Sequence, residues 1–319
     1  MESVAQFLAT PRESTAFSFE ILPPLRGGDI AQTYKNVERL LEFNPAYVNI
    51  TTHRREVVYK DLGGGMARII TSRRRPGSVA VAASLRERYG VRTVPHIICG
   101  EYSRVEIEDQ LIDLSYLGIT DLLLLRGDRD RSSSTFVAGD DGHEHAESLC
   151  RQVTAFNSGA LANGEKCEPL HRPFTFGVAG YPEKHEEAMN PVTDLQFLKN
   201  KVDAGAGYIV TQMFFDNERF FDFVARCRHA GITVPIVPGL KPMTSLRQQA
   251  LLPRTFHLDL PVDLAKELAK CTTDAQVKAL GIEWALAQAR ELKEAGVPSI
   301  HFYAMNASTS VAEIARKLY

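Results

Sequence analysis

Eight short apolar runs recur along the chain, separated by stretches long enough to form helices. Glycine or polar residues follow each run, a pattern typical of buried parallel strands joined by helices. This alternation predicts an α/β fold: a (β/α)8 TIM barrel with extra helices and loop insertions, built as a single catalytic domain over residues 1–319. The predicted strands are Phe17–Leu22, Tyr47–Ile50, Val94–Ile98, Leu122–Leu125, Phe174–Val178, Tyr208–Val210, Val234–Val237 and Ile300–Tyr303.

The segments between the runs contain helix signals. Ser103 is placed to cap a helix over Val105–Leu117, and Gly118 is placed to end it. Two connections are longer than a barrel requires. The one from Thr51 to Val94 contains Gly63–Gly65 and suggests a mobile loop, and the one from Leu240 to Pro298 suggests additional helices. We also expect helices at Ile30–Phe43, Asp194–Ala204, Asn217–Ala230 and Asp274–Ala295, and a surface excursion at Gly159–Pro173.

Charge and composition narrow the class of protein. The net charge of −2 offers no general attraction to nucleic acid or to an anionic membrane. No run approaches the roughly 18 apolar residues of a membrane span, and the N-terminus lacks the apolar segment of a secretory signal. The five cysteines are scattered, which argues against a disulfide framework or a zinc site. We therefore expect a cytoplasmic enzyme with small-molecule substrates, no metal, and no nucleic-acid or membrane partner.

Catalytic residues of such barrels lie at the C-terminal ends of the strands, so polar residues there are functional candidates. Glu20 lies inside the first apolar run, where burial would raise the pKa of its carboxyl and suit it to general acid catalysis near neutral pH. The alternative is a strand-end carboxylate paired with an arginine. Arg126-Gly127-Asp128 directly follows the fourth run; the arginine could bind an anion, or it could form a structural pair with Asp128.

Other candidates carry weaker signals. His96 could be a core residue or a ligand contact, and Gln212, beside aromatic residues, could recognise a heterocycle or bond the barrel rim. His143-Glu144-His145 lacks a metal-binding spacing and reads as a solvated helix start, and Arg73–Arg75 as a solvated helix end. There is no dinucleotide-binding glycine fingerprint and no P-loop, so a nucleotide cofactor would have to be held by the barrel mouth.

Eight segments at the strand ends carry a further signal: Phe17–Pro24, Pro95–Cys99, Leu125–Asp128, Ala179–His185, Lys201–Ala206, Thr211–Asp216, Pro238-Gly239 and His301–Asn306. Taken together and in order, they resemble the methylenetetrahydrofolate reductase family. This resemblance implies the short bacterial type without a C-terminal regulatory domain, which forms homo-oligomers. It implies reduction of 5,10-methylenetetrahydrofolate to 5-methyltetrahydrofolate, feeding methionine synthesis, with FAD as cofactor and NADH or NADPH as co-substrate in a ping-pong hydride transfer.

The resemblance also implies roles for individual residues. Glu20 matches the general acid that assists opening of the five-membered folate ring, and Asp128 matches a catalytic aspartate that contacts the pterin near the flavin. Gln212 matches a residue that contacts the folate, and Thr51 and Gln248 match further substrate contacts. The positions that match FAD-binding or neighbouring residues are Thr51, Thr52, His96, Arg126, Gly127, Asp128, Ala146, Tyr181, His185, Ala188, Asp194 and Lys201.

The chain departs from the family pattern in three places. Thr52–Glu56 replaces a tyrosine and a glycine-rich turn, Ala307 replaces a common arginine, and Asn200 replaces another. Two other functions remain open. One is a different flavin-dependent barrel, such as a proline dehydrogenase relative. The other is a folate- or flavin-binding subunit of a methyl-transfer complex, which the altered loop after Thr51 would suit.

Overall fold

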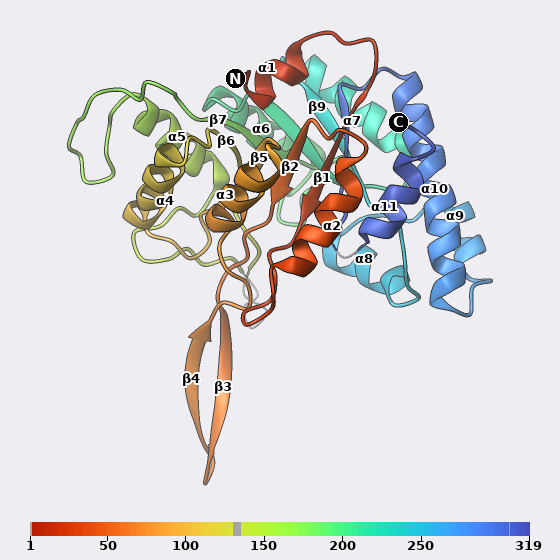
Figure 1. Cartoon of the computed structure of the whole chain (residues 1–319), viewed down its shortest axis with the longest axis horizontal. Coiled ribbons are helices and arrows are strands. Elements are labelled where there is room, and N and C mark those ends of the chain that lie inside the picture. Colours follow the sequence, from red (N-terminus) through yellow and green to blue (C-terminus); the bar gives the residue numbers. More distant parts are fainter. Residues whose placement is uncertain (1, 130–134, 306) are drawn as a thin grey trace.

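The eight predicted strands form a closed parallel barrel, which confirms the predicted fold class (Figure 1). The computed structural model describes residues 2–129, 135–305 and 307–319. Going round the barrel, the strand order is β1-β10-β9-β8-β7-β6-β5-β2. The barrel strands are β1 (Ala16–Ile21), β2 (Tyr47–Ile50), β5 (Thr93–Ile98), β6 (Asp121–Leu125), β7 (Thr175–Gly180), β8 (Tyr208–Met213), β9 (Ile236–Leu240) and β10 (Ser299–Phe302).

Helices cover the outside of the barrel (Figure 1). Ser103 caps α4 and Gly118 follows it, as the sequence predicts. The helices are α1 (Val4–Ala9), α2 (Ala31–Leu41), α3 (Ser78–Tyr89), α4 (Arg104–Tyr116), α5 (Ala146–Asn157), α6 (Pro191–Asp203), α7 (Asn217–His229), α8 (Gln248–Phe256), α9 (Val262–Leu268), α10 (Asp274–Glu294) and α11 (Ser308–Ala315). Of these, α8, α9 and α10 fill the segment from Leu240 to Pro298, where we expected extra helices.

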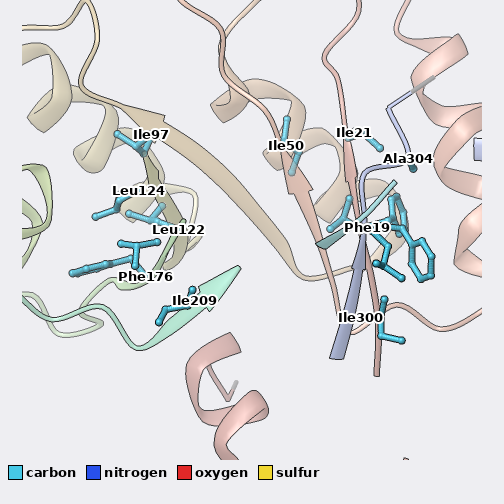
Figure 2. Close-up of a cluster of buried hydrophobic side chains, with 14 of the residues drawn as sticks. Phe19, Ile21, Ile50, Ile97, Leu122, Leu124, Phe176, Ile209, Ile300 and Ala304 are labelled. Atoms are coloured by element: carbon cyan, nitrogen blue, oxygen red, sulfur yellow. The ribbon is translucent and has the colours of Figure 1, made fainter. Parts of the chain in front are cut away.

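Two hydrophobic layers hold the barrel together, because side chains alternate between the faces of each strand. The outer layer packs the strands against the helices, and Figure 2 shows part of it, including Phe19, Ile50 and Leu122. The inner layer fills the lumen with residues such as Tyr47 and Tyr208.

Helix α1, which the sequence analysis did not predict, closes the base of the lumen. Its Val4 and Leu8 pack into the inner layer. Asp121 at the start of β6 accepts hydrogen bonds from the Val4 backbone N–H and the Thr175 hydroxyl, both at 2.8 Å. These bonds fix the position of α1 beneath the strands.

The segment after β2 is a β-hairpin, so the expectation of a mobile loop was wrong. Strands β3 (Glu56–Gly63) and β4 (Met66–Ser72) pair antiparallel and stand clear of the barrel in Figure 1. The glycines Gly63–Gly65 form its turn; all three have φ between 62° and 79°, a backbone region that favours glycine. Arg73–Arg75 follow β4 rather than ending a helix, and Arg73 pairs with Glu101.

Two smaller expectations have mixed outcomes. Gly159–Pro173 contains no helix or strand and lies between α5 and β7, as expected of a surface excursion. Glu144 and His145 are exposed at the N-terminus of α5, as expected of a solvated helix start. His143 departs from that expectation, because it is buried and its imidazole shares a hydrogen bond with Gln152.

Candidate active site

The C-terminal ends of the barrel strands bring together candidates that are far apart in sequence. Glu20 lies on β1, Asp128 follows β6 and Gln212 lies on β8. Because all eight strands are parallel, these three residues lie at the same end of the barrel, opposite α1. We call this end the mouth.

Glu20 is 4% exposed, and burial raises the pKa of its carboxyl to about 8, partly offset by the charge of Lys241. Its Oε2 lies 3.4 Å from His96 Nε2. Burial, together with the charges of His301 and His53, lowers the pKa of His96 to about 3. At neutral pH both groups are therefore uncharged: Glu20 holds its proton and His96 does not. This is the state required of a general acid.

Strand register explains why Lys241 acts on Glu20. Phe19 pairs with Phe302, and Phe302 pairs with Leu240, so the next residues of the three strands, Glu20, Tyr303 and Lys241, form one row across the mouth. The backbone N–H of Met305 donates to the Glu20 carbonyl at 3.0 Å. The Lys241 ammonium lies 3.9 Å from the sulfur of Met305. The row thus places a cation beside the buried acid.

The side of the mouth around β2 and β5 combines satisfied and unsatisfied polar groups. Thr52 donates to the His96 carbonyl at 2.7 Å, and the Thr51 hydroxyl lies 3.2 Å from His53 Nε2. In contrast, Asn49 beside Glu20 is fully buried, and neither its amide oxygen nor its amide nitrogen has a hydrogen-bond partner among the described residues. His96 Nε2 also lacks a well-aligned partner there. Buried polar groups are normally satisfied, so a ligand entering the mouth would find donors and acceptors ready.

The side around β6 and β7 carries the cations. Arg126 pairs with Glu187 through its two terminal guanidinium nitrogens, and the Nη2–Oε1 contact is 2.9 Å, so the alternative of an Arg126–Asp128 pair was wrong. The Lys201 ammonium donates to the Ala179 carbonyl at 2.6 Å, and burial lowers its pKa. Asp194 accepts from the His185 backbone N–H at 3.1 Å.

Several remaining candidates lie around these cations. The Tyr181 ring packs edge-on against His185 with ring centroids 4.8 Å apart. Ala188 is buried, and its carbonyl accepts from Lys184 at 2.7 Å. Ala146 is the first residue of α5, and the N-terminus of a helix attracts anions.

Gly127 in the Arg126–Asp128 loop has a left-handed backbone conformation. Its φ is +88°, and an added Cβ would lie 3.3 Å from Ile98, so glycine is required there. Asp128 is exposed, and its charge acts on His53, whose pKa is lowered chiefly by burial. The Asp128 backbone carbonyl accepts from Arg54 at 3.3 Å. The carboxylate therefore lies in an exposed position at the rim of the mouth, whereas His96 contacts Glu20 directly.

The two candidate glutamines have different surroundings. The Gln212 side-chain oxygen accepts from the Met213 backbone N–H at 2.9 Å. Gln248 accepts from the Thr244 backbone N–H at 2.7 Å and so ties its own loop together at the start of α8. The assigned roles of these residues in substrate binding stay predictions.

Sequence reasoning missed Lys241, Asn49 and Tyr303. Lys241 follows the apolar run of β9 just as Arg126 follows that of β6, so the same rule could have found it. Asn49 is a polar residue within an apolar run, as Glu20 is. Tyr303 gave no such signal; its hydroxyl donates to the Thr211 carbonyl at 2.6 Å.

Within residues 2–129, 135–305 and 307–319, no helix combines the length and apolar character needed to cross a membrane. Also within them, no cluster of three or more histidine, cysteine, aspartate or glutamate side chains is arranged to hold a metal ion. Asn306, the last residue of the matching motif, lies outside the described residues.

Comparison with known proteins adds to this geometry. The family model described as "Methylenetetrahydrofolate reductase" matches residues 4–319. A probable methylenetetrahydrofolate reductase (NADPH) of Caenorhabditis elegans is 31% identical over 95% of this chain and 42% of its own length. Methylenetetrahydrofolate reductase (NADH) 1 of Arabidopsis thaliana is 29% identical over 97% of this chain and 49% of its own length. The chain thus spans about half the length of these relatives.

A bacterial relative matches over nearly its whole length. The 5,10-methylenetetrahydrofolate reductase of Salmonella typhimurium is 29% identical over 96% of this chain and 91% of its own length. Among solved structures, an uncharacterised protein from Clostridium thermocellum that binds two copies of 5-methyl-5,6,7,8-tetrahydrofolic acid shares the fold, with a TM-score of 0.55 at 14% identity and 96% coverage of both chains. The match of the family model over almost every residue establishes that this chain belongs to the methylenetetrahydrofolate reductase family.

Proposed function

We propose that this protein reduces 5,10-methylenetetrahydrofolate to 5-methyltetrahydrofolate with a reduced nicotinamide dinucleotide, using FAD. The observation that carries this proposal is the buried, protonated Glu20 at the mouth of a barrel of this family. The relatives named above support the reaction, and they include both an NADH and an NADPH enzyme. The folate bound by the Clostridium thermocellum protein supports the substrate class.

Glu20 would act as the general acid. Opening the five-membered ring of the folate requires a proton on the departing nitrogen, and the carboxyl of Glu20 holds one at neutral pH because burial raises its pKa to about 8. The ring opens to a cationic iminium. The carboxylate of Asp128 at the rim would stabilise that cation electrostatically, and Gln212 would hydrogen-bond the heterocycle.

The residues at the mouth fit a flavin nucleotide, which when bound would relay hydride from the nicotinamide to the folate. The unsatisfied amide of Asn49 and His96 Nε2 would meet polar atoms of a heterocycle within the mouth. On the other side, Arg126 and Lys201 would offset phosphate charge, together with the N-terminus of α5. Binding there would require Arg126 to exchange its partner Glu187 for the anion.

The test compares the two halves of the reaction. Purified protein is supplied with NADH or NADPH and methylenetetrahydrofolate, and methyltetrahydrofolate is measured by mass spectrometry. Glu20→Gln should lower folate reduction by about 10²–10⁴-fold, the usual value of a general acid. Nicotinamide oxidation with an artificial electron acceptor should persist, since it needs no proton from Glu20.

The matched control is Glu294→Gln, which removes an exposed carboxylate of α10 and should leave both activities unchanged. Unimpaired folate reduction by Glu20→Gln would contradict the assignment of the acid. A wild-type protein that forms no methyltetrahydrofolate with either nicotinamide would refute the proposed activity itself. Oxidation of proline by the same preparation would instead support the alternative flavin-dependent barrel.

A further inference from the structure

The β3–β4 hairpin exposes apolar side chains on both of its faces. We call Glu56–Ser72 the arm. The side chains of Tyr59, Met66 and Ile69 are between 63% and 65% exposed. The eight residues of β3 extend the arm about 27 Å from its base. An isolated two-stranded hairpin is at best marginally stable in water, and its open edges can pair with another chain. A lone arm of this composition therefore lacks a covering surface.

The base of the arm is held firmly, so the arm has a fixed direction. The Glu101 carboxylate, whose side chain is 8% exposed, contacts Arg73 at 2.8 Å and Arg55 at 3.8 Å, and these arginines flank the two ends of the arm. Arg74 also pairs with Glu56 across the base at 2.6 Å. The arm is thus anchored to the loop after β5 while its outer part touches no helix in Figure 1.

One face of the arm carries a cationic pair between two apolar residues. Lys60 is directly opposite Arg68, and like charges in that position destabilise a hairpin. Ile70 and Met66, two residues to either side of Arg68 on β4, point to the same face and are 37% and 65% exposed. Among the described residues, no carboxylate forms an ion pair with Lys60 or Arg68. Two anions from outside would relieve this repulsion.

Helix α4 presents the complementary pattern. Asp109 and Asp113 are exposed, one helical turn apart, and form no ion pair within the described part of the chain. They lie on one stripe with Val105 and Tyr116, which are 50% and 85% exposed. The stripe from Val105 to Tyr116 is about 17 Å long. The facing stripe of the arm, from Ile70 to Met66, is about 14 Å long. In each stripe, two residues of like charge lie between two apolar residues.

We infer that the arm of one copy docks on α4 of a second copy, Lys60 and Arg68 meeting Asp109 and Asp113, in a reciprocal two-fold dimer. The arm points away from the α4 of its own chain (Figure 1), so the two stripes meet only between copies. A two-fold axis makes both contacts at once and leaves no open end for further assembly. This inference does not depend on the catalytic activity.

The experiment is a charge swap followed by sedimentation equilibrium. Wild-type protein should be dimeric at micromolar concentration. The double substitutions Lys60→Glu/Arg68→Glu and Asp109→Lys/Asp113→Lys should each raise the dissociation constant by about tenfold or more, since each places like charges across the contact. The variant carrying all four substitutions restores opposite charges and should regain the dimer. Lys266→Glu on α9, combined with Lys270→Glu just after this helix, makes the same change in charge elsewhere and should leave the protein dimeric.

Each outcome decides the question. A monomeric wild type, or a dimer that both double variants retain, overturns the inference. Loss of the dimer in both doubles without recovery in the combined variant also overturns it, provided that circular dichroism and thermal unfolding show all variants folded. Recovery in the combined variant alone identifies the two stripes as partners, because a misfolded protein would not regain a specific contact.

Discussion

Glu20 makes the stability of this protein depend on pH in a way that one substitution should remove. Its carboxyl has a pKa of about 8 in the folded protein against an ordinary value of 4.5. The folded state therefore holds the proton more tightly than the unfolded state. The stability that the proton contributes is complete below about pH 4.5 and is lost as the pH rises through 8. Glu20→Gln eliminates this dependence because an amide does not titrate.

The size of the effect follows from the two pKa values. Each unit by which the folded pKa exceeds the unfolded pKa corresponds to about 1.4 kcal/mol of lost free energy of unfolding when the carboxyl is ionised. At pH 6 the wild type has lost about 2 kcal/mol, and at pH 9 about 5 kcal/mol, relative to a protein whose Glu20 stays neutral. The advantage of Glu20→Gln in free energy of unfolding should therefore grow by about 3 kcal/mol between these pH values.

The measurement is urea-induced unfolding of both proteins at several pH values between 6 and 9, followed by circular dichroism. Glu294→Gln, at an exposed site, should follow the wild type throughout. Two parallel stability curves for Glu20→Gln and wild type would refute the reasoning, because they would mean that Glu20 is already ionised at pH 6. The same substitution should lower folate reduction by about 10²–10⁴-fold, so a protein that is more stable but much less active is the expected result.

Three further predictions follow from contacts described above. Folate reduction should fall at alkaline pH near pH 8, where Glu20 loses its proton. Lys241→Met removes the cation beside Glu20 and should move this fall upward by about one pH unit, whereas Lys241→Arg should not. An unchanged pH profile in Lys241→Met would contradict the row across the mouth. Glu101→Ala should loosen the base of the arm, seen as faster amide hydrogen exchange in β3 and β4, and unchanged exchange would show that the arginines do not hold it. Asp121→Ala leaves the Val4 N–H without its partner and should lower the free energy of unfolding by about 1–3 kcal/mol in urea titrations; a loss below 0.5 kcal/mol would show that α1 is not fixed there.

The barrel could be predicted from sequence because every strand is short, apolar and followed by a polar break. The same regularity located Glu20: a carboxylate within an apolar strand is unusual, and its burial follows from the pattern around it. The partners of each candidate could not be predicted, because they come from different strands. Arg126 pairs with Glu187 in the connection after β7 rather than with Asp128, which is close in sequence. No local sequence pattern specifies this partner.

The arm was missed for a different reason. Its strands carry both apolar and charged residues on each face, so neither strand shows the alternation of apolar and polar residues that is typical of a half-buried strand. The three consecutive glycines near its turn suggested a loop instead. Helix α1 was missed because six residues give too short a periodic signal. The roles of individual residues toward FAD and folate, the homo-oligomer, the cytoplasmic location and the link to methionine synthesis stay predictions.

Helix α1 and the tyrosines of the inner layer close the lumen of the barrel at the end opposite the mouth. A molecule that reaches Glu20 through the mouth therefore leaves through the mouth as well. Under the proposed activity, oxidised nicotinamide bound at the mouth would obstruct the arriving pterin, and each reactant in excess would inhibit turnover by occupying the entrance that both share.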